Sequence, residues 1–370
     1  MTRRAPALVG VALAVLSALG GGAPVAAGDG DGSAPASASE PPLTFYLRYR
    51  DLLVRHRAAR FRPGARSRER ALERARRIAA LARSEPADFV ELVRRCSEAP
   101  GAFGAPDAAA PSAGIPAAAA GLVLARRSNL TEAFAGRVAA LAPGEISQPI
   151  ASDAGFHVIR REPHVERMAS AILIAWQGAP RTGPDVTRTR SEAAALTSEV
   201  LTTLAAQPER FDELARERSD VADRESGPAL GVVTAGLIEP AVWGALTRLD
   251  EGEVAGRAVE TAGGFLILRR DPLRLALYEQ LLVEAGAGRT MEEALSLAGE
   301  LIEQARAGQS LGALAERTPA TRRTLAGPIP QTGPQAEARL QRRIFSVKAG
   351  EVCAEPLLTD RGPLVLRRLR

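Results

Sequence analysis

Cysteine, histidine and lysine are scarce in this chain of 370 residues. The two cysteines, Cys96 and Cys353, are too few for a disulfide framework or a CxxC zinc knuckle, and three histidines leave little room for a metal enzyme. Lys348 is the only lysine, so arginine carries nearly all of the positive charge. Aromatic residues make up 4% of the chain, so its cores must be built from aliphatic side chains. We therefore expect no metal and no cofactor.

Concentrated charge is also lacking. The formal net charge is +5 at pH 7, and the positive excess is spread along the whole chain. Nucleic-acid-binding domains carry a basic patch or stripe, so we expect no nucleic-acid partner. The composition, with 46% hydrophobic and 25% charged residues, is that of a globular protein. The length predicts two to four domains, at roughly 100 to 200 residues each.

The beginning of the chain has the three parts of a secretory signal. Arg3 and Arg4 precede an apolar run from Ala7 to Leu19, and small residues at 25–27 form a cleavage site. The run is short for a bilayer, which takes about 20 apolar residues, although an uncleaved anchor is the alternative. Residues 28–44 are rich in glycine, serine, alanine and proline, as in a flexible linker. We expect a signal peptide at 1–27, a linker at 28–44, and an exported protein of the periplasm or cell envelope that has no membrane span after cleavage.

Three segments of the chain repeat one ending. Each contains a Gly-Glu step and a second glycine that opens an apolar strand ending in two arginines. The segments are LAPGEISQPIASDAGFHVIRR from Leu141, LDEGEVAGRAVETAGGFLILRR from Leu249 and VKAGEVCAEPLLTDRGPLVLRR from Val347. Their Gly-Glu glycines are 108 and 98 residues apart. Such spacings indicate domain-sized copies, because solenoid repeats have units of about 20 to 50 residues.

Each copy also begins alike, with an apolar strand followed by helical patterns. The strands start near Tyr49, Ala169 and Tyr278. Long amphipathic helices are predicted at 71–81, 193–204 and 294–305, short ones from Phe89, Phe211 and Leu311, and one more before each Gly-Glu step. This order predicts an α+β fold in which each copy is a small antiparallel sheet backed by helices. We place the copies at 45–163, 164–271 and 272–370.

These features resemble the parvulin family of peptidyl-prolyl cis-trans isomerases. The resemblance rests on the opening strand, the Phe-x-x-Leu-x-x-x-x-Ser helix from Phe89 and again from Phe211, the Leu230-Gly231 pair, the Gly-Glu turn and the Gly-Phe-His-Val-Ile strand at 155–159. It extends over three copies between Tyr46 and Arg370. It implies tandem parvulin-like domains, of which the second and third are degenerate.

The resemblance implies a site with two histidines on neighbouring central strands, a hydroxyl group, and a cysteine or aspartate. In the first copy His157 and Ser152 match the closing histidine and the hydroxyl. Asp51 replaces the opening histidine, and Ala99 stands at the Cys/Asp position. A carboxylate next to an imidazole favours the charged imidazole, so we expect weakened isomerisation. The residues that match the proline pocket are Leu122, Leu130 and Phe134.

These site residues also have structural interpretations. His157 could be a core histidine satisfied by a neighbour, and Ser152 could cap the turn that follows it. Asp51 needs a partner if it is buried, and Arg55 and His56 are candidates for an ion pair.

Five arginines follow the first opening strand, and two of them resemble the basic loop of phosphate-preferring parvulins. In those proteins the loop binds an acidic or phosphorylated residue before the proline, and arginine forks suit such anions. Arg55 and Arg60 are the matching residues. A solvated basic loop is the alternative.

The second and third copies lack the imidazole. Leu266 and Leu364 stand where the first copy has His157, and Ala171 and Gln280 stand where it has Asp51. Only the hydroxyl positions are kept, as Thr261 and Thr359. We expect both copies to be inactive as isomerases.

The sequence thus predicts an exported prolyl isomerase and folding factor, with its catalysis in the first copy. Its partners would be proline-containing unfolded or exported polypeptides. Rotation about a peptide bond crosses a barrier of about 18 to 20 kcal/mol, which an enzyme lowers by preferring the twisted amide and not by a nucleophile or metal. Two alternatives remain: an isomerase-inactive chaperone or scaffold that binds unfolded chains, and a structural part of an envelope assembly.

Overall fold

The computed structural model describes residues 43–60, 64–84, 89–99, 121–180, 182–220, 228–286, 288–331 and 338–370. The predicted signal peptide and all but the end of the predicted linker lie outside these residues. Within them, no helix has the length and apolar character needed to cross a membrane. They divide into two compact units, one with Glu166–Arg274 and Pro330–Arg342, the other with the residues up to Val165, Leu275–Ile329 and Arg343–Arg370.

The described residues form three four-stranded sheets of one topology. The strand orders are β2-β1-β4-β3, β6-β5-β8-β7 and β10-β9-β12-β11, so the first and last long strands of each repeat are central. The β1–β4 and β5–β8 pairs are antiparallel, and so is the β9–β12 pair. The predicted α+β class with tandem parvulin-like sheets is confirmed, whereas the domain boundaries stay a prediction.

The three repeats present their elements in the same order. The first contains β1 Tyr46–Val54, α2 Arg68–Ser84, α3 Phe89–Cys96, β2 Leu122–Arg126, α4 Glu132–Ala139, β3 Ile150–Ser152 and β4 Gly155–Arg161. The second contains β5 Glu166–Ile174, α5 Arg190–Ala206, α6 Phe211–Arg218, β6 Ala229–Thr234, α7 Pro240–Leu246, β7 Val259–Thr261 and β8 Gly264–Asp271. The third contains β9 Leu275–Val283, α8 Met291–Arg306, α9 Leu311–Arg317, β10 Thr321–Pro330, α10 Ala338–Phe345, β11 Leu357–Thr359 and β12 Gly362–Arg368.

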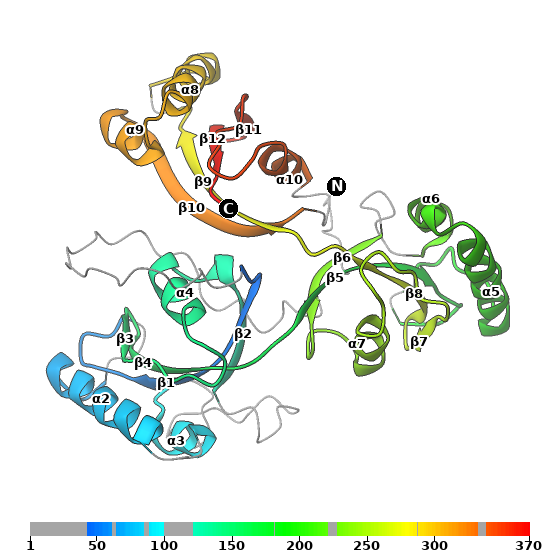
Figure 1. Cartoon of the computed structure of the whole chain (residues 1–370), viewed down its shortest axis with the longest axis horizontal. Coiled ribbons are helices and arrows are strands. Elements are labelled where there is room, and N and C mark those ends of the chain that lie inside the picture. Colours follow the sequence, from blue (N-terminus) through cyan, green and yellow to red (C-terminus); the bar gives the residue numbers. More distant parts are fainter. Residues whose placement is uncertain are drawn as a thin grey trace. The chain divides into compact units, whose positions relative to one another are not determined.

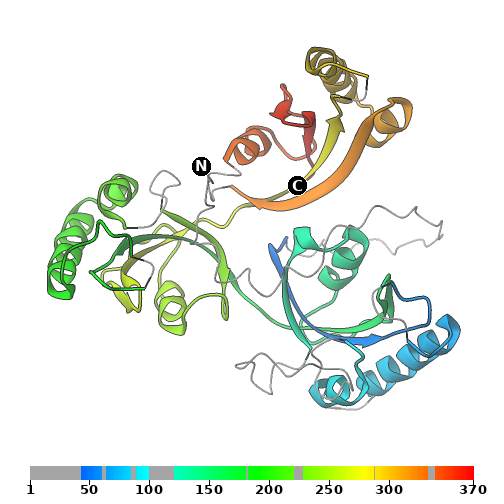
Figure 2. The ribbon, with the colours of Figure 1, turned by 180° about the vertical axis from the view of Figure 1, so that it is seen from behind.

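Helices cover both faces of the first sheet. The long helix α2 and the short helix α3 lie on one face, and α4 lies on the other (Figure 1). The second and third sheets repeat this arrangement, with α5 and α6 opposite α7 and with α8 and α9 opposite α10, as the view from behind also shows (Figure 2). The central strands are therefore buried on both faces, which explains why β4 and β8 read as nearly continuous apolar runs.

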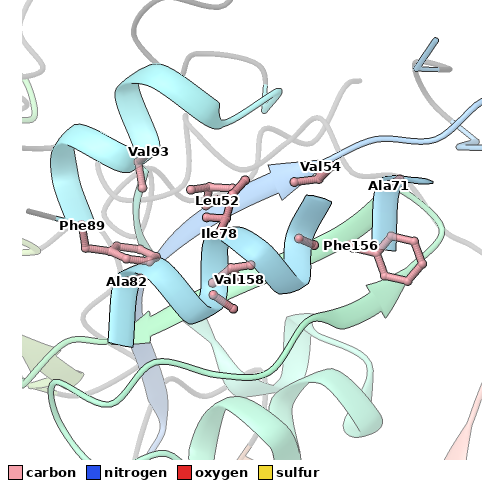
Figure 3. Close-up of a cluster of buried hydrophobic side chains, with 11 residues drawn as sticks. Leu52, Val54, Ala71, Ile78, Ala82, Phe89, Val93, Phe156 and Val158 are labelled. Carbon is pink, nitrogen blue, oxygen red and sulfur yellow. The ribbon is translucent and has the colours of Figure 1, made fainter. Parts of the chain in front are cut away.

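The core under α2 and α3 shows how the helical spacing is used. Phe89 and Val93 point from α3, and Ile78 from α2, toward Leu52 and Val158 on the central strands (Figure 3). Phe89, Val93, Leu52 and Val158 are fully buried. Small alanines on α2 allow the helix to approach the sheet closely, so the core is filled although the chain has few aromatic residues.

The Gly-Glu step makes the same turn in all three repeats. The glycine has φ near +90° and donates its N–H to the carbonyl oxygen of an arginine at the end of the last strand, at 2.7 Å each time. The glutamate side chain accepts the backbone N–H three residues earlier, at 2.8, 2.6 and 2.8 Å. The turn residues are Gly144 and Glu145, Gly252 and Glu253, and Gly350 and Glu351. The Gly-Glu pair that recurs in the three repeats therefore forms a turn capped by its own glutamate. This structural role accounts for the recurrence without a functional one.

The second glycine of each ending meets the first strand of its repeat. Gly155 has φ +140°, and a Cβ atom there would lie 2.5 Å from the carbonyl oxygen of Val54. Gly264 and Gly362 have φ +146° and +139°, with corresponding distances of 2.7 and 2.1 Å to Ile174 and Val283. Only glycine fits this position, because both the φ angle and the close approach exclude a side chain.

We predict that Gly155→Ala lowers the free energy of unfolding of the first repeat by about 1 to 3 kcal/mol from backbone strain, and by more from the contact with Val54. Gly144→Ala is the matched control, because Gly144 has φ +87° but no atom within 4 Å of the added Cβ. Gly144→Ala should lower the free energy of unfolding by only about 1 to 2 kcal/mol. Hydrogen exchange of the β4 amides measures both. Equal costs for the two variants would contradict the close approach.

Candidate functional site

The candidate site lies on the face of the first sheet that α4 covers. Paired residues of antiparallel strands share a face, and the register pairs Leu53 of β1 with His157 of β4. Asp51 is two residues before Leu53 and so belongs to the same face, diagonal to His157. Ser152 ends β3, the strand on the other side of β4, and pairs with Gly155. Three strands therefore bring together residues 51, 152 and 157.

The three polar side chains form a continuous hydrogen-bonded chain. His157 Nδ1 lies 2.9 and 3.0 Å from the two carboxylate oxygens of Asp51. His157 Nε2 lies 2.7 Å from Ser152 Oγ. The proposed partners Arg55 and His56 are therefore wrong for Asp51, because the cross-strand register gives it His157 instead. The turn-cap interpretation of Ser152 holds as well, since its Oγ accepts the N–H of Ala154 at 3.0 Å.

These contacts determine the tautomer of the imidazole. An ionised carboxylate only accepts hydrogen bonds, so Nδ1 of His157 carries a hydrogen and donates to Asp51. In the neutral ring Nε2 is then the acceptor and takes the hydroxyl hydrogen of Ser152. In the charged ring Nε2 donates to Ser152 Oγ instead.

The surroundings of His157 act on its pKa in opposite directions. The side chain is 11% exposed, and this burial lowers the pKa of His157, because the charged ring loses solvation. The charge of Asp51 and its hydrogen bond to the ring raise the pKa. The two contributions of Asp51 together exceed that of burial, so the pKa of His157 lies above its ordinary value of 6.5.

An apolar surface borders the polar chain. The ring of Phe134, on α4, stands edge-on to the ring of His157, with centroids 5.3 Å apart. Phe134 and Leu130 are half-buried and pack against the apolar cluster between α4 and the sheet. Leu122 starts β2 opposite Arg50, and its neighbour Val123, not Leu122, packs against that cluster. Of the three predicted pocket residues, Phe134 thus contacts the imidazole, Leu130 packs against the same apolar cluster as Phe134, and Leu122 lies outside this cluster.

Tyr49 is a site residue that sequence reasoning missed. It lies two residues before Asp51 on the same face of β1, and its ring contacts that of Phe134 at 6.0 Å between centroids. Burial, and then the charge of Asp51, raise the pKa of Tyr49 far above its usual range. The alternation of Tyr49, Asp51 and Leu53 along the opening strand was the signal that could have found it.

The two predicted basic residues take different positions. The backbone N–H of Arg55 donates to a carboxylate oxygen of Glu98 at 2.8 Å. Arg60 approaches the turn after Ser152: its N–H donates to the carbonyl oxygen of Asp153 at 2.8 Å, and its guanidinium lies 3.7 Å from the Asp153 carboxylate. Both side chains of this ion pair are more than half exposed. Arg60 therefore lies beside the turn that follows Ser152, with its guanidinium more than half exposed.

The serine of the short helix supports the strand behind the site. Ser97 Oγ accepts the N–H of Leu53 at 3.1 Å, and Glu98 N–H donates to the carbonyl oxygen of Leu53 at 2.8 Å. The second repeat has the same contacts from Ser219 and Asp220 to Leu173. The serine that ends the repeated Phe-x-x-Leu-x-x-x-x-Ser pattern thus binds the backbone of the strand residue that pairs with position 157 or 266.

The second and third sheets have the same frame without the polar chain. The registers pair Leu173 with Leu266, and Leu282 with Leu364, so the two leucines occupy the position of His157. The hydroxyl groups turn to their own hairpins, where Thr261 donates to Gly264 at 2.9 Å and Thr359 to Gly362 at 2.6 Å. Among the residues that the structure describes, no group of three or more His, Cys, Asp or Glu could hold a metal ion.

The comparison with protein families identifies the class of this chain. A family model described as rotamase, PPIC-type PPIase domain, matches residues 52–163 and 172–271. The matches span more than half of the chain, which therefore belongs to the PPIC-type peptidyl-prolyl isomerase (parvulin) family. They coincide with the first two repeats. The search of the curated proteins finds no match.

Solved structures resemble parts of the chain. Peptidyl-prolyl isomerase ESS1 from Candida albicans is 28% identical with a TM-score of 0.27, over 29% of this chain and 63% of that one. PrsA from Bacillus subtilis is 24% identical with a TM-score of 0.22, over 29% of this chain and 35% of that one. A SurA-like chaperone structure from Campylobacter jejuni is 20% identical with a TM-score of 0.23, over 30% and 39%. The chain thus spans less than two thirds of the length of these three.

We predict that Asp51→Asn lowers the pKa of His157, because it removes the charge that outweighs burial. A raised pKa in the folded state stabilises the first repeat fully below pH 6.5, and this contribution is lost as the pH rises through the folded pKa. NMR titration of the His157 ring in both proteins checks this. A pKa of His157 below 6.5 in the unmodified protein would contradict the ion pair.

Proposed function

We propose that this family member is an exported prolyl isomerase and folding factor, acting on prolyl bonds of unfolded or exported polypeptides, with weak catalysis confined to the first repeat. The observation that supports this most is the chain from Asp51 through His157 to Ser152 beside Phe134. The proline ring would lie against Phe134 and Leu130, and the hydroxyl of Ser152 would face the carbonyl group. Twisting the amide removes its resonance, so a site that prefers the twisted form lowers the barrier without a covalent step.

Two departures from the parvulin pattern support weak rather than strong catalysis. Asp51 replaces the opening histidine, so the pair of neutral imidazoles becomes an imidazole held by a carboxylate. Ala99 has no side-chain polar group at the expected Cys/Asp position, and its N–H donates to Ser97 Oγ at 3.3 Å. Both changes leave fewer adjustable polar groups around the carbonyl.

The proposal includes an anion-binding role for one residue of the basic loop, Arg60. Arg60 reaches the turn that carries Ser152, through Asp153. An exposed ion pair of this kind is weak and is easily exchanged for an acidic residue of a peptide. Arg55 contributes through its backbone contact with Glu98, which holds the loop at the end of β1.

The second candidate is an isomerase-inactive chaperone that grips unfolded chains. It is favoured by the leucines at positions 266 and 364, which keep the apolar surface and remove the imidazole. Both leucines are half-buried, so part of each side chain is left for contact with an apolar segment. Under this alternative all three repeats bind, and none accelerates isomerisation.

A protease-coupled prolyl isomerisation assay on the whole chain separates the two candidates. We expect His157→Ala to lower kcat/KM by about tenfold or more, because it removes both hydrogen bonds of the site. Thr261→Ala, at the equivalent hydroxyl of the second repeat, should leave the rate unchanged. A rate for the unmodified chain no higher than for His157→Ala would contradict catalysis. Suppression of aggregation of an unfolded protein, equal in both chains, would then favour the chaperone.

Export has its own test. When the chain is expressed with residues 1–42 in a bacterial host, we expect a mature protein in the periplasmic fraction that begins at Gly28, because the small residues at 25–27 precede this point. Replacing both Arg3 and Arg4 by glutamate should reduce the exported fraction. Mass spectrometry of the N-terminal peptide checks the cleavage point. A membrane-bound chain that still begins at Met1 would favour the uncleaved anchor.

A further inference from the structure

The polar chain of the first repeat has the connectivity of an activated serine. A carboxylate holds Nδ1 of an imidazole, and Nε2 of the same ring contacts a serine hydroxyl at 2.7 Å. Serine nucleophiles are activated in this way: the imidazole accepts the hydroxyl proton, and the carboxylate keeps the tautomer and stabilises the imidazolium. Both distances are within the range that proton transfer requires.

The surroundings suit an attack by Ser152 from solvent. Ser152 is exposed, whereas His157 is buried and Asp51 is half-buried. The hydroxyl group is therefore open to a reagent, while its base is shielded from water. The N–H of Ala154 holds Oγ in place at 3.0 Å. The half-buried ring of Phe134 stands edge-on to the buried ring of His157 and forms an apolar wall beside this pair of groups.

The second and third repeats lack this arrangement at the same turn. Thr261 and Thr359 donate to the carbonyl oxygens of Gly264 and Gly362, and leucines take the place of the base. Their hydroxyl hydrogens are tied to the backbone, with no group able to accept a proton from them in these bonds. The second and third repeats thus serve as internal controls for the reactivity of Ser152.

We propose that Ser152 is a nucleophile toward small activated acyl and phosphonyl groups, with His157 as its base and Asp51 as a positioning residue. With an activated ester, Ser152 Oγ forms a bond to the acyl carbon, its proton passes to His157 Nε2, and the phenolate leaves. His157 gives this proton to the leaving phenolate and is again neutral. Water then attacks the acyl carbon and gives a proton to His157, which passes it to Ser152 Oγ as the carboxylic acid leaves. This activity is independent of prolyl isomerisation, which needs no covalent intermediate.

The test is labelling of the whole chain with an alkyl fluorophosphonate, in which Oγ binds phosphorus and fluoride leaves. We expect one label per chain, on Ser152 by peptide mass spectrometry, and none in Ser152→Ala. His157→Gln and Asp51→Asn should slow labelling by at least about tenfold. Thr261→Ser places a serine at the matching turn of the second repeat and should add no label. Ser128→Ala, at another exposed serine of the first repeat, should leave the rate unchanged.

A second readout separates activation from folding. Circular dichroism shows whether His157→Gln is folded, and Asp51→Asn keeps the shape of the side chain. The labelling rate should rise with pH as His157 loses its proton, and Asp51→Asn should move this rise to lower pH. Hydrolysis of p-nitrophenyl acetate should show the same dependence on all three residues.

Labelling of Ser152 that does not depend on His157, or labelling no faster than at Thr261→Ser, would overturn the proposal. The isomerisation assay is independent of this result. Isomerisation without labelling would contradict only the proposal that Ser152 is a nucleophile. Labelling without isomerisation would contradict only the proposed function.

Discussion

The close approach of a glycine to the opening strand is the constraint from which the site follows. In each repeat the hairpin before the last strand lies so near a carbonyl oxygen of the first strand that a Cβ atom cannot fit. The contact sets the hairpin against the end of that strand and so determines the cross-strand register. In the first repeat this register places Ile150 opposite His157, and Leu53 on the other side of it. The imidazole thus lies between a carboxylate and a hydroxyl because of backbone geometry.

The same frame explains why the polar groups are lost together. A buried imidazole needs partners on both nitrogens, and a half-buried carboxylate needs a donor. Once leucine replaces the histidine, as at Leu266, an aspartate at the neighbouring position would be left unpaired, and the second repeat has Ala171 there. The third repeat has Gln280, a neutral residue. The hydroxyl survives because Thr261 can bond its own hairpin.

The sequence predicted the repeats well because their turns are local. The Gly-Glu step, the second glycine and the helix patterns act within a few residues, so each copy shows them directly. The partner of Asp51 depends on which residues of two strands face each other, 106 positions apart in the chain. Sequence reasoning chose Arg55 and His56, which are near in the chain, whereas the register selects His157. Leu122 was predicted as a pocket residue, but its neighbour Val123 lies in the apolar cluster instead, since a shift of one residue changes the face of a strand.

One imidazole can support both proposed chemistries, because its charge decides where the hydroxyl hydrogen of Ser152 points. In the neutral ring Nε2 accepts that hydrogen, and Oγ is prepared for attack. In the charged ring Nε2 and the N–H of Ala154 both donate to Oγ. The hydroxyl hydrogen is then available to a substrate carbonyl, which is the contact that the proposed isomerisation would use. Asp51 raises the pKa of His157, so the pH decides between the two states. Below this pKa the charged ring leaves the hydroxyl free to hold a carbonyl, and above it the neutral ring, held by Asp51, accepts the hydroxyl proton.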